Sequence, residues 1–156
     1  MRKKGFLQLA FLAVALFLAL PVVAQNESVV TLAGNAYITS GSGASIDEAN
    51  CAIRNWSDKE TVISFYFRTT ESGNMNIALQ AKGKSRIEVS LLGKKKKVTL
   101  NSETLSRIEL GTFKIKNPGY VKVDVRGLKI NEGDDFGSIE SVIVGGHVSP
   151  VVCVTS

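Results

Sequence analysis

Residue types that carry most enzyme chemistry are scarce in this sequence of 156 residues. It contains one histidine, His147, and two cysteines, Cys51 and Cys153. His147 has no sequence-level partner as a general base, and neither cysteine stands in a known nucleophile motif. The sequence also lacks a Gly-x-Ser-x-Gly motif and a phosphate-binding loop. We therefore predict a protein that is not an enzyme and needs no cofactor.

Metal ligands are equally sparse. Two cysteines and one histidine make a structural zinc site a poor interpretation. The acidic segment Glu132-Gly133-Asp134-Asp135 is the nearest approach to a metal loop, because calcium binds clustered carboxylates and backbone carbonyls. The full calcium-loop spacing is missing, so a polar turn is favoured and no metal ligand is predicted. Whether calcium binds near this segment stays open.

Only one long apolar run occurs, and it lies near the N-terminus. Three basic residues at positions 2–4 precede an apolar run over residues 5–20, and small residues at 22 and 24 follow Pro21. A basic start, an apolar core and small residues before a cleavage site are typical of a secretory signal peptide. The alternative is a membrane anchor, but the run is shorter than the ~20 residues that a spanning helix needs. We expect cleavage after Ala24.

This interpretation divides the chain into a signal peptide (1–24) and a single domain (25–156). The mature domain would be secreted, periplasmic or at the cell surface, without a membrane span. Three of the 19 basic residues belong to the signal, which leaves 16 against 14 acidic residues. Such a balance does not favour nucleic acid as a partner. The lysine run 94–97 could form a polyanion patch, but a solvated turn and edge strand is favoured.

An even number of cysteines in an oxidising compartment suggests one disulfide, here between Cys51 and Cys153. It would close a loop of about 100 residues and restrict the unfolded chain. The alternative is two buried thiols, which behave as small hydrophobic side chains.

Apolar and polar residues alternate over much of the mature sequence, in the ranges 62–68, 74–82, 86–91 and 121–126. Alternation with period two is typical of half-buried antiparallel strands. Turn residues separate the ranges at 71–73, 82–84, 93, 117–119 and 131–134, about ten residues apart. The pattern predicts an all-β protein, an antiparallel β-sandwich of about eight to ten strands.

Two places break the pattern. The apolar positions Ile108 and Leu110 change parity to Phe113 and Ile115, which a β-bulge at Gly111-Thr112 would explain. The segment 40–50 is the loosest part of the mature chain, and its residues 46–49 could form one helical turn.

Aromatic and amide side chains are the positive signal for a binding site. Trp56 is the only tryptophan, and Tyr37, Tyr66 and Tyr120 are the only tyrosines. Sugar rings stack on aromatic rings, while amide, carboxylate and guanidinium groups form hydrogen bonds with the sugar hydroxyls. The predicted ligand-binding residues are Asn55, Trp56, Asp58, Tyr66, Arg68 and Tyr120. A sole tryptophan could instead fill the core of the sandwich, and Tyr66 could merely cover an edge.

Several of these segments carry a resemblance to a known family. They are Gly34-Asn35-Ala36-Tyr37, Asn55-Trp56-Ser57-Asp58, Tyr66-Phe67, Gly73, Ser85-Arg86-Ile87, Gly111-Thr112-Phe113 and Pro118-Gly119-Tyr120-Val121-Lys122-Val123. Together they resemble a domain family of unknown function from secreted proteins of gut bacteria. That family is similar to carbohydrate-binding modules of the galactose-binding, jelly-roll type. Over residues 28–146, the resemblance implies a jelly-roll β-sandwich and association with glycans, but it supplies no ligand residues.

These observations predict a secreted, non-catalytic binding module whose expected partner is a polysaccharide or glycan. The alternative is a protein–protein interaction or assembly module of the bacterial envelope that does not bind sugar. The lack of catalytic motifs is equally compatible with this function. A hydrolase is the third and weakest interpretation. Glycosidase chemistry needs two suitably spaced carboxylates, but 14 acidic residues always allow some pair, so their presence is no signal for an enzyme.

Overall fold

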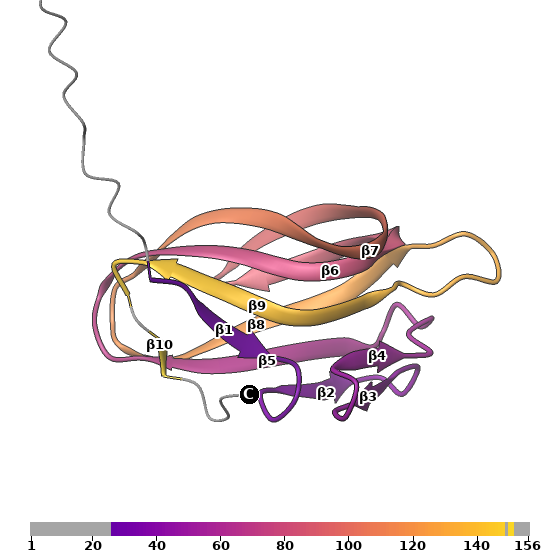
Figure 1. The fold of residues 1–156 in the computed structure, drawn as a ribbon, viewed down its shortest axis with the longest axis horizontal. Helices are drawn as coiled ribbons and strands as arrows, with labels where there is room; N and C mark the ends of the chain where they lie inside the picture. The colour runs from indigo at the N-terminus through magenta and orange to yellow at the C-terminus, as the bar shows by residue number, and fades with distance from the viewer. Residues whose placement is uncertain (1–25, 149, 152–156) are drawn as a thin grey trace, which may run out of the picture.

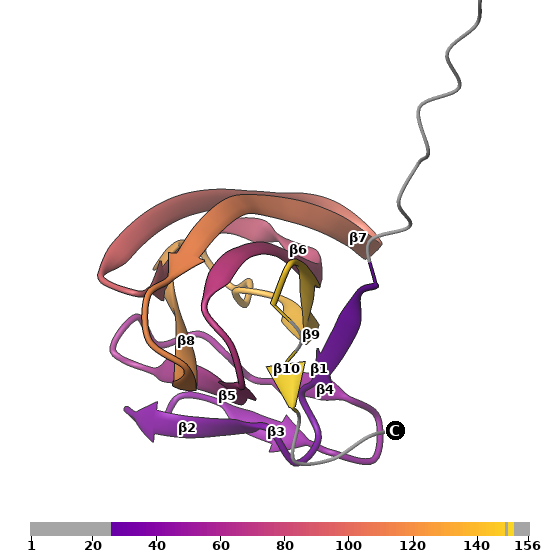
Figure 2. The same cartoon turned by 90° about the vertical axis from the view of Figure 1, so that its left-hand side faces the viewer.

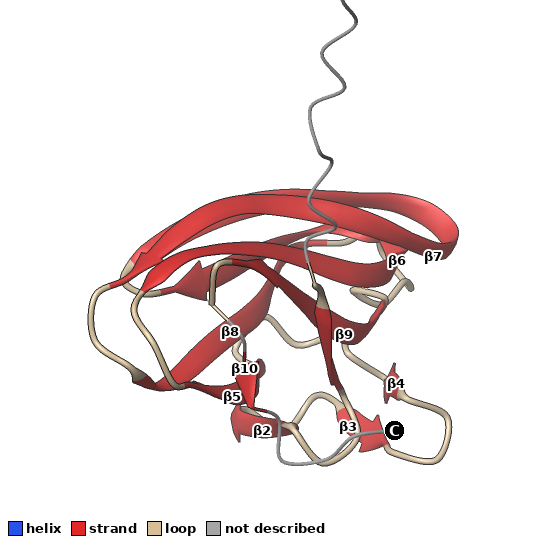
Figure 3. Cartoon of the chain, turned by 60° about the vertical axis from the view of Figure 1, so that its left-hand side comes forward, coloured by secondary structure: helices blue, strands red, loops and turns tan. Residues whose placement is uncertain are grey.

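The structure is a computed structural model that describes residues 26–148 and 150–151. Its regular elements are all strands, and no helix among these residues is long and apolar enough to cross a membrane (Figures 1 and 3). The strands are β1 (Ser28–Thr31), β2 (Ala36–Ser40), β3 (Ser45–Asp47), β4 (Ala52–Arg54), β5 (Val62–Thr69), β6 (Gly73–Leu91), β7 (Lys94–Ile115), β8 (Gly119–Lys129), β9 (Ser138–Gly146) and β10 (Pro150–Val151). The predicted signal peptide lies outside the described residues.

Apolar residues at every second position make β5 and β8 half-buried strands. Ile63, Phe65 and Phe67 on β5 are fully buried, and Val123 on β8 lies opposite Phe65. Successive side chains of a strand point to opposite faces, so these residues enter the core and their neighbours face outward. The alternation predicted from the sequence is therefore confirmed in these two strands.

The long strand β6 contributes to both halves of the sandwich. Its first part, from Met75, pairs with β9, and its second part, up to Leu91, pairs with β8. Gly83 lies between the two parts with a φ of 147°, and a Cβ there would come within 2.9 Å of the Gly137 Cα. Glycine tolerates both this conformation and this approach. The predicted turn at 82–84 was therefore wrong, because the chain bends there within one continuous strand.

The strand order is β1-β9-β6-β8-β5-β10, with β2 beside β5 and β7 beside β6, and every pair is antiparallel. Seen from one end, β7, β8, β5 and β9 surround a common interior (Figure 2). The largest buried side chains that fill it include Trp56, Phe65, Phe67 and Phe136. The predicted all-β antiparallel sandwich is thus confirmed.

The predictions for the two places where the sequence pattern breaks have different outcomes. A register shift lies where Ile77 of β6 pairs with Gly111 and the next residue pairs with Glu109, which leaves Leu110 as the extra residue of β7. The predicted bulge is therefore confirmed, one residue earlier than expected. The helical turn predicted at 46–49 was wrong, because Ile46 belongs to β3 and pairs with Ile53 of β4 in a small hairpin.

Candidate functional site

Aromatic and basic side chains gather on the outer face of β2, β5 and β8. Tyr66 of β5 lies opposite Lys122 of β8, and Arg68 lies opposite Tyr120. Residues opposite each other, and those two positions apart on one strand, share a face of the sheet. Because the intervening Phe67 is fully buried, these four side chains point outward.

Tyr37 on β2 completes this group. It lies opposite Ser64, two residues before Tyr66, and the rings of Tyr37 and Tyr66 have centroids 6.0 Å apart at an interplanar angle of 59°. Tyr37 is 55% exposed and Tyr120 is 76% exposed, whereas Tyr66 is half-buried. All three tyrosines of the chain thus share one side of the sheet. We call the group the tyrosine face; it consists of Tyr37, Tyr66, Arg68, Tyr120 and Lys122.

A chain of polar contacts runs across the strands beside the tyrosines. The Thr39 and Ser64 hydroxyls are 2.7 Å apart, and Ser64 Oγ donates to Asp124 Oδ1 at 2.5 Å. The other carboxylate oxygen of Asp124 lies 2.9 Å from Lys122 Nζ. The hydrogen bond to Asp124 raises the pKa of Lys122 above its usual range, and Coulombic attraction by Asp124 adds to it. Lys122 therefore stays charged at neutral pH, and its ammonium group is held near Tyr66.

This arrangement suits a flat polar ligand that has an apolar side. The exposed tyrosine rings offer surfaces for stacking, and aromatic contacts of this kind contribute through both burial and ring electrostatics. Arg68 and Lys122 supply hydrogen-bond donors next to the rings. Among the described residues, no group of three histidine, cysteine, aspartate or glutamate side chains is placed to hold a metal ion.

The structure places Trp56 in the core, which corrects its predicted sugar contact. The side chain is fully buried, and its ring packs on Phe136 with centroids 5.2 Å apart. The Phe136 N–H also donates to the Trp56 carbonyl at 2.7 Å. Asn55, just before it, has a φ of 56°, which marks a tight turn into the interior. A ring with no exposed surface cannot stack on a sugar, so Trp56 fills the core.

Asn55 and Asp58 lie apart from the strands that carry the tyrosine face. Asn55 lines an open hollow of about 420 Å³ together with Arg54, Lys82 and Asp135. The Asp58 carboxylate accepts hydrogen bonds from the Glu60 N–H at 2.9 Å and the Thr61 hydroxyl at 3.4 Å. Asp58 therefore stabilises its own turn. Of the six residues predicted to bind ligand, the structure brings together Tyr66, Arg68 and Tyr120.

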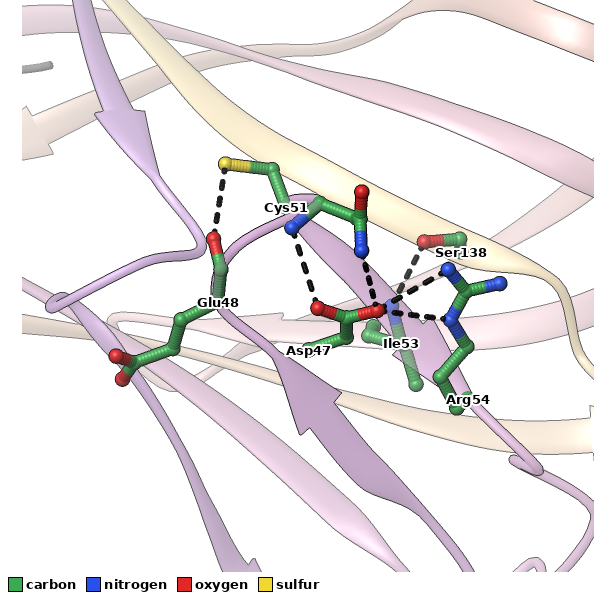
Figure 4. Close-up of polar contacts among 7 residues, drawn as sticks. Asp47, Glu48, Cys51, Ile53, Arg54 and Ser138 are labelled. Atoms are coloured by element: carbon green, nitrogen blue, oxygen red, sulfur yellow. Dashed lines mark hydrogen bonds and ion pairs between the residues drawn. The ribbon is translucent and has the colours of Figure 1, made fainter.

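The hairpin of β3 and β4 holds Cys51 in a network of local contacts (Figure 4). Its thiol donates to the Glu48 carbonyl at 3.8 Å, and no disulfide to Cys51 occurs among the described residues. Asp47 accepts hydrogen bonds from Asn50 and Arg54 in the same hairpin. Cys153 lies outside the described residues, so the Cys51–Cys153 disulfide stays a prediction.

Two other sequence features lie at the surface. His147 is exposed, and its backbone N–H donates to the Asn74 carbonyl at 2.9 Å. In the acidic turn 132–135, the Asp135 carboxylate accepts a hydrogen bond from the Gly137 N–H at 2.9 Å. The turn is exposed throughout, in agreement with the favoured interpretation as a polar turn.

Sequence reasoning missed Tyr37, Lys122 and Asp124 as members of the site. Tyr66 and Arg68 were both predicted to bind ligand, and simple alternation along β5 places them on one face. The other residues join them only through pairing of β5 with β2 and β8, and no local pattern specifies that pairing. Counting the tyrosines on predicted outward positions of neighbouring strands is the signal that could have found Tyr37.

A family model described as a domain of unknown function, DUF5077, matches residues 30–149. No curated protein matches the chain. Several solved structures with a similar fold contain carbohydrate-binding modules (CBMs). One is the GH26-CBM35 β-(1,4)-mannanase of Podospora anserina, with 12% identity and a TM-score of 0.61. The similarity covers 83% of this chain but only 28% of the mannanase.

Two isolated modules are similar over nearly their whole length. The CBM36-1 domain of a multidomain xylanase from the hindgut metagenome of Trinervitermes trinervoides has 14% identity and a TM-score of 0.56, covering 78% of this chain and 98% of the module. The CBM35 of Cellvibrio japonicus Abf62 has 14% identity and a TM-score of 0.54, covering 83% and 100%. At such low identity these similarities establish the fold, which is the jelly-roll β-sandwich of those modules.

Proposed function

We propose that this chain, which belongs to the DUF5077 family of domains of unknown function, is a non-catalytic module that binds carbohydrate through its tyrosine face. The observation that carries the proposal is the placement of all three tyrosines on one outer face of β2, β5 and β8. Two of their rings are more than half exposed. The similar folds of CBM35 and CBM36 modules support a glycan as the ligand.

The roles of the residues follow from their chemistry. Tyr120, with the most exposed of the three rings, would stack on the apolar side of a sugar. Arg68 lies directly opposite it and would donate hydrogen bonds to sugar hydroxyls. Tyr66 and Lys122 form the next cross-strand pair and would extend the site along the sheet. The ion pair with Asp124 would keep Lys122 in position.

We also propose that the protein is exported by its N-terminal segment and acts in the periplasm, at the cell surface or outside the cell. In that case residues 25–156 form the mature domain. The mass of the purified exported protein tests this division. A mature chain that begins at Gln25 supports it, and a retained segment of residues 1–24 contradicts it.

Affinity electrophoresis through gels that contain single polysaccharides tests the proposed function. We expect retardation in at least one polysaccharide gel, and loss of that retardation in the double variant Tyr66→Ala/Tyr120→Ala. Leu92→Ala is the matched control, because Leu92 is an exposed apolar residue in the turn between β6 and β7. No retardation in any gel, together with a stable protein partner in a pull-down, would contradict the proposal and favour an assembly module.

A further inference from the structure

We propose that the ligand is an anionic polysaccharide, whose carboxylate or sulfate groups bind a basic region next to the tyrosine face. This inference rests on the proposed carbohydrate binding and specifies the class of carbohydrate. The basic region consists of five side chains on β6, β7 and β8, which are Arg86, Lys95, Lys97, Arg126 and Lys129.

Strand pairing brings these side chains together on the outer face of the sheet. Glu88 of β6 lies opposite Lys97 on β7 and opposite Arg126 on β8. Arg86, two residues before Glu88, lies opposite Lys129 on β8. Two residues share a face when they are opposite or two positions apart. The basic region therefore forms one surface across three strands.

The basic region and the tyrosine face belong to the same side of the sheet. Lys122 and Arg126 are both on β8 with Asp124 between them, so three successive outward positions connect the two groups. Strands in a sheet are ~4.8 Å apart, so β5 and β7, three spacings apart, lie ~14 Å from each other. A chain-like ligand can therefore cross from one group to the other.

The region carries more positive charge than its one carboxylate can neutralise. The Glu88 side chain is 8% exposed, and its Oε1 lies 3.0 Å from Arg126 and 3.5 Å from Lys95. Arg86, Lys97 and Lys129 form no ion pair with any described residue. Three cations on one surface are thus left without an ion-pair partner among the residues that the structure describes. Such a surface attracts anionic groups, and the attraction weakens as salt increases.

Arg86 and Lys129 also line two neighbouring hollows. One has a volume of about 290 Å³ and includes Asn101 and Asn131. The other has a volume of about 340 Å³ and includes Lys97, together with Glu88, whose carboxylate is paired with Arg126. A carboxylate or sulfate in either hollow would lie next to the charged donors of Arg86 and Lys129 and to other polar or basic side chains. Charge-assisted hydrogen bonds of this kind are stronger than neutral ones.

The lysine run 94–97 does not form one uniform patch. On the outer face, Lys95 lies opposite Ser90 and Lys97 lies opposite Glu88. Lys96 lies opposite Val89, which is buried. The ammonium group of Lys94 lies 5.7 Å above the Phe113 ring centre. Lys94 and Lys96 therefore lie toward Phe113 and Gly111 of the same strand, and the other two lysines join the basic region. This division favours a localised anion site over general attraction to polyanions.

Chain composition favours a polysaccharide over nucleic acid as the anion. Domains that bind nucleic acid usually carry a large excess of basic residues, whereas residues 25–156 have 16 basic and 14 acidic residues. The positive charge here is local, and it adjoins exposed tyrosine rings suited to sugars. Uronic acids carry carboxylates and sulfated sugars carry sulfates, and both supply the required negative charge, so the experiment has one arm for each.

Matched pairs of polysaccharides test the inference, because the members of each pair share a sugar backbone and differ in whether it carries anionic groups. In affinity gels we expect stronger retardation by polygalacturonate than by its methyl ester, or by dextran sulfate than by dextran. The first result indicates carboxylate recognition and the second sulfate recognition. The double variant Arg86→Gln/Lys129→Gln should weaken anionic binding about fivefold at low salt, since each exposed ion pair contributes modestly. The difference in binding between this variant and the wild type should become smaller at high salt.

The control Lys114→Gln/Lys116→Gln removes the same charge elsewhere, since Lys114 is exposed on β7 opposite Asn74. An equal loss in this control would overturn the inference, because net charge would then explain binding. Retardation by polyphosphate as strong as that by the anionic polysaccharide would also overturn the inference, because polyphosphate has no sugar ring. If neutral polysaccharides bind as tightly as charged ones and depend on the tyrosines, the inference fails while the proposed function stands. If no polysaccharide binds, the proposed function itself fails.

Discussion

Arg68 and Tyr120 lie directly opposite each other on β5 and β8, although 52 positions separate them in the sequence. Tyr120 is the second residue of β8, and Arg68 is close to the C-terminal end of β5. Val151 of β10 flanks Arg68 on its other side. The pair therefore stands at one end of the tyrosine face, with rigid strands holding both side chains. We therefore expect a single substitution here to change the proposed binding without changing the fold.

Replacing Tyr120 by alanine should weaken polysaccharide binding and leave stability almost unchanged. The ring is 76% exposed, so its removal creates no cavity. Loss of one stacking contact is worth about 1 kcal/mol, or about fivefold in affinity. Tyr120→Phe keeps the ring and should retain most of the binding. Titration calorimetry on a polysaccharide that retards the wild type measures both variants, and equal affinities of Tyr120→Ala and wild type would exclude stacking at this residue.

Replacing Trp56 by alanine should have the opposite effect, a large loss of stability. Its ring is fully buried against Phe136, and removing a large aromatic side chain from a core costs about 3–5 kcal/mol. Trp56→Phe keeps part of the packing and should cost less. Urea unfolding followed by circular dichroism gives the free energies of unfolding. A Trp56→Ala variant as stable as the wild type, but unable to bind polysaccharide, would restore Trp56 as a ligand contact.

The contrast between Tyr66 and Trp56 shows what the sequence could predict. Tyr66 lies in a strand with regular alternation, so its outward direction followed from the buried Phe65 and Phe67. Trp56 lies in an irregular segment after β4, where no periodicity defines a direction. Its burial depends on Phe136, 80 positions away in the sequence. Local patterns thus predicted the strands, while long-range packing decided which aromatic rings remained exposed.

The basic region illustrates the same limit in electrostatics. Within residues 25–156, the lysine run 94–97 is the only run of adjacent basic residues, and the other cations are scattered along the sequence. Pairing of β6 with β7 and β8 places Arg86, Arg126 and Lys129 beside Lys97. Charge clusters built across strands depend on register, which a single sequence does not specify.

Acidification should weaken the hairpin of β3 and β4 through Asp47. Hydrogen bonds from Asn50, and then from Arg54, lower the pKa of the Asp47 carboxyl below its usual 3.8. A lowered folded-state pKa means that this stabilisation is fully present above the unfolded-state pKa. It is lost as pH falls through the folded-state value. NMR titration of the Asp47 carboxyl measures the shift directly.

The variant Asp47→Asn provides the matched control for this pH effect. It should lose the extra local stability at neutral pH and show a flatter pH dependence of hydrogen exchange in the hairpin. Because the group is exposed, we expect a local effect on residues 45–54 rather than global unfolding. An Asp47 pKa at or above 3.8 in the folded protein would contradict this interpretation.

A methyl group at Gly127 should destabilise the fold by overpacking, because the position has no space for a side chain. Gly127 is buried on β8, and a Cβ there would overlap the ring of Phe136. We expect Gly127→Ala to cost about 1–3 kcal/mol, since Phe136 is itself packed against Trp56 and cannot move freely. Urea unfolding compares it with Gly145→Ala, where the nearest atom is the Glu27 Cγ at 3.3 Å, on a flexible side chain.

A second substitution tests whether the Phe136 ring is the group that excludes a side chain at Gly127. Phe136→Leu makes the facing side chain smaller, so it should destabilise the wild type but partly relieve the clash in Gly127→Ala. The two costs should therefore sum to more than the cost of the double variant, as expected for residues in direct contact. Strictly additive costs would mean that the Phe136 ring is not the group that excludes a side chain at Gly127.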